Sequence, residues 1–477
     1  MAVDLATPGA LTGPSSVQAT PKAKKANVSG REVLADQLVI WGIATSTFFL
    51  VFFGDPSENR WRRHPFFSLV DVFAVLMIGF GLVEAAKALR AGRRLPSTPI
   101  AKALVVLLGA LVLSFAVHPS AMGLATLMHF GVVVVIARQI EQRPQLVRPV
   151  ILTVMSIATF EAIVAAGQFI GKRALGLQIL GEVLDPFITF GDGPSTALVP
   201  SGTMFHPYPL TGFCLLAVAL AAVAVRASMV KPAFAIFTAC MCGVMVGLSA
   251  SIAAALTAAL LGVALLTASV VAMKKHKAQR PVAAVLLAFA LGISVAAPAA
   301  KAAWQWKGDR TSQGVEAAGN GRVALLRQAG EMIKRWPITG VGPGRYMAER
   351  DANPEIAAVA KEPQPVHNLF ALVVVESGVF GAVALLYLLS QTFRAMRRNW
   401  MVVLIVGASL SGNLMLDHYL WLFTAGSVQL GVAFGVIGAL CARSVGGGAF
   451  PLGSDTSIEP GTTSAEINAK NLEPSAS

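Results

Sequence analysis

Apolar stretches of about 18 to 25 residues recur along almost the whole chain, and no other feature restricts its fold as strongly. A helix needs about 20 apolar residues to cross the hydrocarbon core of a bilayer. The composition agrees, because 55% of the residues are hydrophobic and only 13% are charged. An ordinary soluble domain carries roughly a quarter charged residues. The sequence therefore predicts an all-α polytopic membrane protein.

The apolar runs predict about twelve transmembrane helices. They are expected at 37–54, 67–90, 99–117, 120–138, 149–170, 209–226, 232–248, 250–271, 281–299, 366–391, 399–415 and 420–441. Arginines and lysines gather in alternate connectors, as at Arg138, Arg143 and Arg148. Basic connectors remain on the cytoplasmic side of the membrane. This pattern places both termini in the cytoplasm, and it accounts for the net charge of +13 without nucleic-acid binding.

The topology divides the chain into a transmembrane domain and two tails. Residues 1–35 and 444–477 are polar and rich in small residues, so we expect disordered cytoplasmic tails. The domain itself, 36–443, has two long outer connectors at 171–209 and 300–366. The second of these is a large periplasmic loop between the ninth and tenth helices. Because the other outer turns are short, we expect the chemistry in these two loops.

The second loop contains a predicted amphipathic helix. Asn320 is a plausible N-cap and Pro337 a stop, with apolar residues three or four apart between them. We expect one packed side, made of Arg322, Leu326, Ala329, Ile333 and Trp336. Arg322 and the amides at the helix start suit an external phosphate. A solvated surface arginine is the alternative.

A glycine-rich turn, 340–344, follows this helix and is itself followed by Arg345. It is not surrounded by a βαβ unit, so we exclude a dinucleotide site and expect it to turn the chain sharply against the bundle. His367 opens the next span, where an imidazole is either a general base or a hydrogen-bonded structural group. Glu376 lies on the same helix, and at about 100° per residue it points away from His367.

A polar corner, Asp417-His418, separates the last two spans. These side chains either form a polar latch at the outer surface or touch the substrate.

Two segments carry a resemblance to a known family. The run RWPITGVGPGRY followed by HNLFALVVVESGVFG resembles the signature of the O-antigen ligase and polymerase superfamily, with Gly378 and Gly381 at its glycine positions. The stretch SGTMFHPYPLTGF, residues 201–213, is similar to a second family segment. It contributes Gly202, Thr203, His206 and Pro207, with Tyr208 where asparagine is usual. The resemblance covers roughly residues 200–439.

Two positions depart from the family pattern. Val199 and Ile252 stand where relatives often carry an arginine that holds the lipid diphosphate. Arg322 is therefore the arginine expected to bind the diphosphate. The possible substitutes for the missing arginines are Lys172, Arg173, Arg327 and Arg345.

The resemblance implies metal-independent, inverting glycosyl transfer from an undecaprenyl-diphosphate-linked glycan, with no cofactor. Arg322 and His367 would be catalytic. Substrate-binding roles would fall to Arg345, Arg327, Asn368, His206 and Thr203. The expected product is polymerised repeat units of an O-antigen or exopolysaccharide, and the alternative acceptor is lipid A-core, which would make the protein a ligase. Implied partners are membrane lipid and the chain-length regulator and flippase of the same pathway, and no nucleic acid.

Two readings without catalysis remain open. One is a lipid or oligosaccharide transporter, and the other is a non-catalytic scaffold of an export complex. Transporters usually show two similar halves and a polar site at the membrane midplane. Neither feature is apparent in this sequence, whose polar residues concentrate outside the spans.

Overall fold

The computed structural model describes residues 30–48, 51–53, 67–92, 98–182, 199–204, 206–273, 280–301, 321–360 and 364–443. The predicted tails lie outside these residues apart from 30–35. There, α1 (Gly30–Ala44) already begins, upstream of the expected boundary at residue 36. The predicted N-cap Asn320 also lies outside the described residues.

The helices confirm the all-α polytopic class. Within the described residues, nine helices are long and apolar enough to span a membrane. They are α2 (Leu69–Arg90), α3 (Pro99–Val117), α4 (Ala121–Gln142), α5 (Val147–Gly171), α6 (Pro207–Arg226), α8 (Ile252–Met273), α9 (Arg280–Ala299), α13 (Leu369–Leu416) and α15 (Thr424–Arg443). Two shorter apolar helices are α1 and α7 (Pro232–Leu248), and short 3-10 turns cover Pro144–Leu146 and Gln178–Leu180.

Two predicted spans fall within the single element α13. It runs for 48 residues, but Gly378 and Asn399 have non-helical backbone angles. Asn399 marks the change of direction between the predicted spans 366–391 and 399–415. The total of twelve spans stays a prediction.

The first predicted span, 37–54, is wrong at its end. The helix stops at Ala44, and β1 (Val51–Phe53) pairs antiparallel with β2 (Phe67–Ser68). The Thr45 hydroxyl donates to Trp41 O (2.8 Å) and the Ser46 hydroxyl to Ile43 O (2.7 Å), bonds that compete with helical ones. The following run, FFLVFF, consists of residue types that favour strands.

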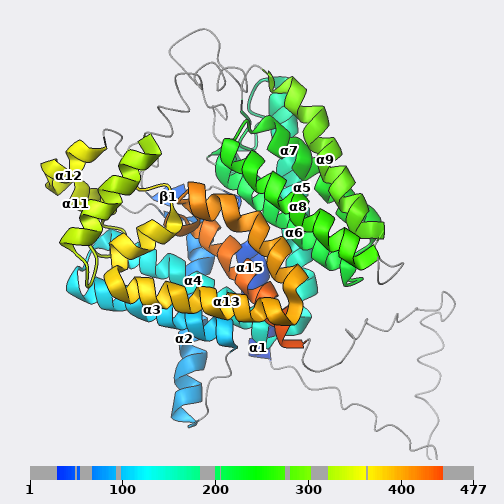
Figure 1. Ribbon diagram of the computed structural model, residues 1–477. Helices are drawn as coiled ribbons and strands as arrows, with labels where there is room; N and C mark the ends of the chain where they lie inside the picture. The colour runs from blue at the N-terminus through cyan, green and yellow to red at the C-terminus, as the bar shows by residue number, and fades with distance from the viewer. Residues whose placement is uncertain are drawn as a thin grey trace, which may run out of the picture.

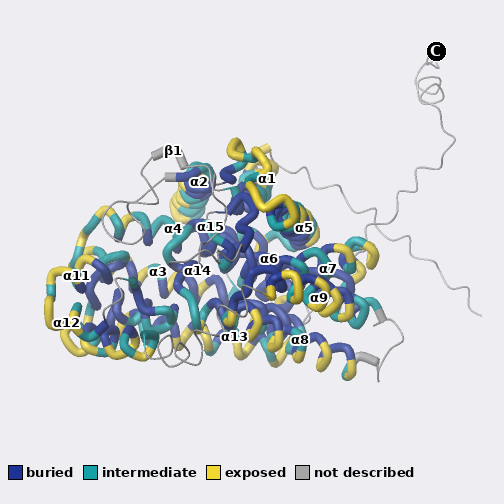
Figure 2. The backbone as a smooth tube through the Cα atoms, turned by 90° about the horizontal axis from the view of Figure 1, so that it is seen from above, coloured by how far each residue is buried: buried dark blue, intermediate teal, exposed yellow. Residues whose placement is uncertain are grey.

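Helix α6 is the centre of the bundle (Figure 2). Between Pro207 and Val225 every residue is buried except Tyr208, which is half-buried. Helices α5, α7, α8, α9 and α13 all contact α6. Figure 1 shows α5, α7 and α9 standing together at one side, while α3, α4 and α13 lie at the other. A helix this enclosed is apolar because it forms the core.

Contacts between connectors agree with the topology read from the basic residues. Arg143 forms an ion pair with Asp36 (2.7 Å), and Arg148 Nε donates to Met229 O (3.0 Å). All four residues lie in segments predicted on the cytoplasmic side. The segments predicted on the outer side contact one another at the opposite end, as described below.

The outer loop adds a small helical cap to the bundle. It consists of a helix at 321–335, α11 (Tyr346–Ala352) and α12 (Pro354–Val359), and it lies across the molecule from α7 and α9 in both views (Figures 1 and 2). The first helix ends before Pro337, as predicted. Residues 183–198 and 302–320 of the two long loops are outside the described chain.

The predicted packed side of helix 321–335 is wrong by about one position. The buried residues are Leu325, Gln328, Ala329 and Met332, whereas Leu326 is 46% exposed. Gln328 donates to Ile356 O (2.8 Å) and accepts from the Tyr346 hydroxyl (3.1 Å). The packed face therefore includes Gln328, a polar residue whose side chain is hydrogen-bonded on both sides. A search for apolar residues at helical spacing overlooks such a position.

Candidate functional site

The glycine turn is bound to the backbone of α13, where that helix is broken. Val341 N donates to Val375 O (2.9 Å), and Gly342 N donates to Glu376 O (3.1 Å). The break is at Gly378, which has φ +62, and a Cβ there would lie 2.2 Å from Ile338 O. The expectation that the turn packs against the bundle is thus confirmed, and Gly378 permits this contact.

Two side chains hold the same region in place. Ser114 Oγ lies 2.6 Å from Thr339 O and 2.7 Å from Glu376 O, so its single proton is shared between two carbonyls. Glu376 Oε2 accepts from Trp421 Nε1 (2.8 Å). Glu376 therefore connects α13 to α14 (Tyr419–Leu422), and its side chain is fully buried.

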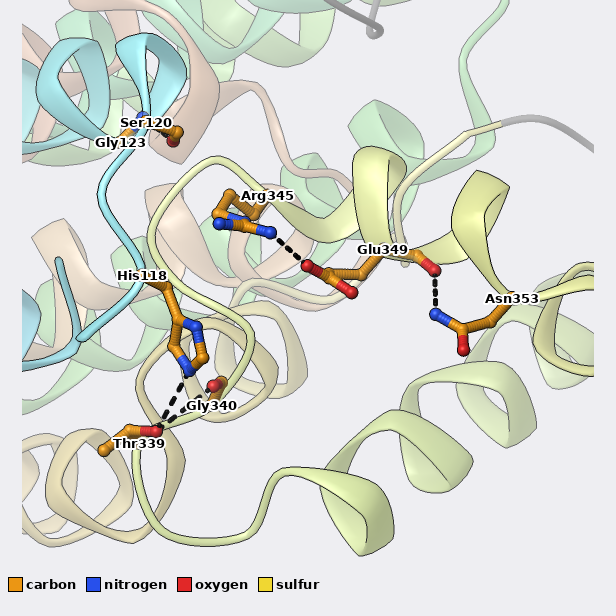
Figure 3. Close-up of polar contacts among 8 residues, drawn as sticks. All are labelled: His118, Ser120, Gly123, Thr339, Gly340, Arg345, Glu349 and Asn353. Atoms are coloured by element: carbon orange, nitrogen blue, oxygen red, sulfur yellow. Dashed lines mark hydrogen bonds and ion pairs between the residues drawn. The ribbon is translucent and has the colours of Figure 1, made fainter.

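Arg345 lies beside this turn with an acidic partner of its own (Figure 3). Its guanidinium forms an ion pair with Glu349 on α11. A Cβ on Gly342 would contact both Arg345 and His118, the latter in the turn between α3 and α4. His118 Nε2 is 3.4 Å from the Thr339 hydroxyl. The structure thus places Arg345 beside the glycine turn and paired with Glu349.

The two ends of α13 meet on the side of the bundle predicted to face outward. Asn368 caps the start of the helix by accepting from Ala371 N (2.9 Å), and its Nδ2 donates to Met415 O at the other end (3.4 Å). The rings of His367 and His418 have centroids 4.6 Å apart. Donor atoms of His367, Asp417 and His418 all lie within 4.8 Å of one another, which makes them candidate metal ligands.

Two further elements reach this cluster. Arg322, near the start of helix 321–335, acts electrostatically on His367, on Asp417 and on Tyr208. Tyr208 is the half-buried residue at the start of α6. His206 caps that helix by accepting from Tyr208 N (3.2 Å), and its ring is 4.5 Å from the Tyr208 ring.

Burial determines the charge state of the cluster. It lowers the pKa of His367 to about 4, with His418 and Arg322 adding to the effect and Asp417 opposing it. Burial also lowers the pKa of His418 to about 3. The pKa of Asp417 is raised by burial, although His367 and Arg322 act to lower it. Both imidazoles are consequently neutral near pH 7, the state in which His367 could accept a proton.

Thr203 and Arg327 lie elsewhere. Thr203 is fully buried, its N–H donating to Glu161 Oε2 (2.8 Å) and its hydroxyl to the other oxygen of that carboxyl group. Gly202 N donates to Gln168 Oε1 (2.9 Å). These bonds attach the segment before His206 to α5. Arg327 is exposed on helix 321–335.

The structure thus brings together Arg322, His367 and His206 from the sequence-predicted set. It adds Tyr208, Asp417 and His418. A sequence signal for the last two existed, because the LDHYLW corner is polar and follows a span directly. The sequence could not predict the contact between this corner and His367, because the contact depends on the change of direction within α13.

Comparison with known proteins agrees with the signature residues. A search of curated proteins gave no match. Residues 211–386 match the family model described as O-antigen ligase, a range that contains Arg322, Arg345 and His367. This match confirms the resemblance to the O-antigen ligase and polymerase superfamily over residues 211–386, and the apolar helices show that the chain is a multi-pass membrane protein.

Proposed function

We propose that this protein polymerises the repeat units of an O-antigen or exopolysaccharide on the outer face of a bacterial inner membrane. The donor is a glycan on undecaprenyl diphosphate, and the acceptor is another lipid-linked repeat unit. The observation that supports this most directly is the convergence of Arg322, His367 and Asp417 from three segments at one end of the bundle.

His367 acts as the general base. Its neutral imidazole takes the proton of the acceptor hydroxyl, the hydroxyl oxygen bonds to the anomeric carbon, and the electron pair of the breaking bond leaves with the diphosphate. A single displacement of this kind inverts the anomeric configuration. Asp417 stabilises the imidazolium that forms, since its carboxylate raises the pKa of His367.

Arg322 binds the departing diphosphate. No described residue forms a hydrogen bond or an ion pair with its guanidinium, so its donors are available to phosphate oxygens. Charge that grows on the diphosphate in the transition state is therefore stabilised without a metal ion.

The remaining predicted residues contribute less directly. Thr203 is bonded to the Glu161 carboxyl group through its N–H and its hydroxyl, and Asn368 caps α13, so they position the segment before His206 and the start of α13. Arg327 and Arg345 supply positive charge to the outer loop. As partners we propose the chain-length regulator and the flippase of the same pathway.

Surface-glycan analysis of a deletion strain tests this function. The strain is complemented with wild type, His367→Ala, Arg322→Ala or the control Lys334→Ala, whose side chain is 73% exposed and paired with Glu331. Membrane levels of each protein are matched. We expect the first two variants to lose long chains and to accumulate single lipid-linked repeats, and the control to behave as wild type.

The ligase alternative is favoured by the description of the matched family model. In that case the two variants would accumulate full-length lipid-linked polymer together with bare lipid A-core. Normal glycan in both variants would exclude catalysis by this site and favour a transporter or an export scaffold.

A further inference from the structure

The side chains of His367, Asp417 and His418 can do more than transfer a proton, because together they resemble a metal-binding site. We propose that His367, Asp417 and His418 form a binding site for a zinc-type transition-metal ion, and that the bound ion blocks glycosyl transfer. The inhibitory part rests on the proposed function, whereas metal binding does not.

The donor set is appropriate for such an ion. Two imidazoles and one carboxylate are the ligands of many zinc sites that keep an open position. All three donor atoms lie within 4.8 Å of one another. In a tetrahedral zinc site the ligand atoms are about 3.4 Å apart, as follows from bond lengths of about 2.1 Å. Small side-chain rotations would therefore close the cluster around an ion.

One carboxylate oxygen of Asp417 is available to bind a metal ion, and the other is held by the backbone. Its Oδ1 accepts from His418 N (2.7 Å) and Tyr419 N (3.2 Å), which fixes the carboxylate in place. Among the described residues, no hydrogen bond is made by Oδ2. Carboxylates that are held by backbone amides and keep one oxygen available are well prepared for a metal ion.

His418 and His367 differ in how far they are exposed. His418 is 2% exposed, so its ring is enclosed by protein, whereas His367 is half-buried. An ion that enters from the outer surface would meet His367 first. Coordination takes the lone pair with which His367 would accept a proton, and this is why occupancy prevents the reaction.

The positive charge of Arg322 opposes a bound cation. It acts on both His367 and Asp417, so it weakens metal binding. The proposal therefore makes two predictions of opposite sign. Removal of a ligand lowers the affinity, and neutralisation of Arg322 raises it.

The test uses the full chain in detergent, purified with a tag that contains no histidine and stripped of metal. Zn²⁺ is titrated calorimetrically, and Co²⁺ is followed by its visible absorption. We expect one ion per chain. His367→Gln, Asp417→Asn and His418→Gln should each weaken binding at least about tenfold. Arg322→Gln should strengthen it, and His118→Gln is the control at a histidine outside the cluster.

X-ray absorption of the zinc-loaded wild type supplies a readout that does not depend on variant folding. A spectrum that shows two imidazole ligands on the zinc ion supports the site, whereas a spectrum without imidazole ligands overturns it. Affinity that is equal in all variants also overturns it. In glycan-transfer assays, Zn²⁺ should inhibit wild type and a chelator should restore activity. Binding with unchanged or increased activity would overturn the inhibitory role, and binding by a chain without transfer activity would refute only the proposed function.

Discussion

The indole of Trp421 donates a 2.8 Å hydrogen bond to the carboxyl group of Glu376, and both side chains are buried in the bundle. The backbone carbonyl of the same glutamate accepts from Gly342 and from Ser114. One residue, Glu376, therefore joins the broken helix α13, the glycine turn and the short helix α14.

Trp421→Phe should destabilise the protein, because the mutation leaves a buried carboxyl oxygen without its donor. We expect a loss of about 1 to 3 kcal/mol. Thermal unfolding in detergent measures this as a lower midpoint. Trp41→Phe is the matched control, since Trp41 is 58% exposed on α1. Equal midpoints for the two variants would refute the importance of the bond.

Gly378→Ala should release the glycine turn from α13. The added Cβ would clash with Ile338 O, and φ +62 disfavours any side chain. We expect faster proteolysis within the outer loop and a large loss of transfer activity. Gly330→Ala, in helix 321–335 with open space around it, should leave both unchanged or add up to about 1 kcal/mol of stability. The prediction fails if the two alanine variants behave alike.

The pH dependence of transfer should follow His367. Its pKa of about 4 keeps the base neutral at pH 7, so activity should fall only as the pH drops toward 4. Asp417 raises this pKa, and Asp417→Asn should therefore move the acidic limb to lower pH. Rates measured with a chelator present exclude metal effects. An acidic limb near pH 6.5, or one that moves upward in the variant, would contradict this assignment.

The same pKa has a consequence for stability. The unfolded histidine titrates near 6.5, above the folded value, so the unfolded chain binds its proton first as the pH falls. The contribution of His367 to the free energy of unfolding should be fully present above about pH 6.5 and should decline toward pH 4. His367→Gln should reduce that decline in thermal unfolding scans.

Arg322 should be irreplaceable by a simple positive charge. We expect Arg322→Ala to lower transfer in membranes by about 100-fold or more, as for loss of a group that stabilises transition-state charge. Arg322→Lys should recover only part of this, because lysine lacks the planar donors that grip phosphate oxygens. Lys334→Ala on the same helix should keep wild-type rates. Full activity of Arg322→Lys would mean that charge alone suffices.

Much of the helical architecture could be predicted from the sequence, because apolar length depends only on local composition. The ranges 99–117 and 232–248 coincide with α3 and α7. The end of α1 could not be predicted, because a short apolar run rich in aromatic residues does not distinguish a helix from a strand. The buried face of helix 321–335 was missed because the partners of Gln328 come from α11 and α12.

For the site, the motifs indicated His367 and Arg322 but gave no indication of their neighbours. Asp417 lies far along the chain, and its proximity to His367 arises only when α13 reverses at Asn399. Likewise, the hydrogen bond between the glycine turn and Val375 could not be predicted from the sequence, because backbone hydrogen bonds do not require particular residue types. Long-range geometry of this kind requires the folded structure.

The reversal of α13 also affects when the site can exist during synthesis. His367 emerges from the ribosome before the elbow at Asn399, and Asp417 emerges after it. A nascent chain that has already inserted its helices up to the first half of α13 still lacks the partner of its proposed base. The protein therefore remains without a complete site until its last helices enter the membrane, and a chain interrupted before that point has none.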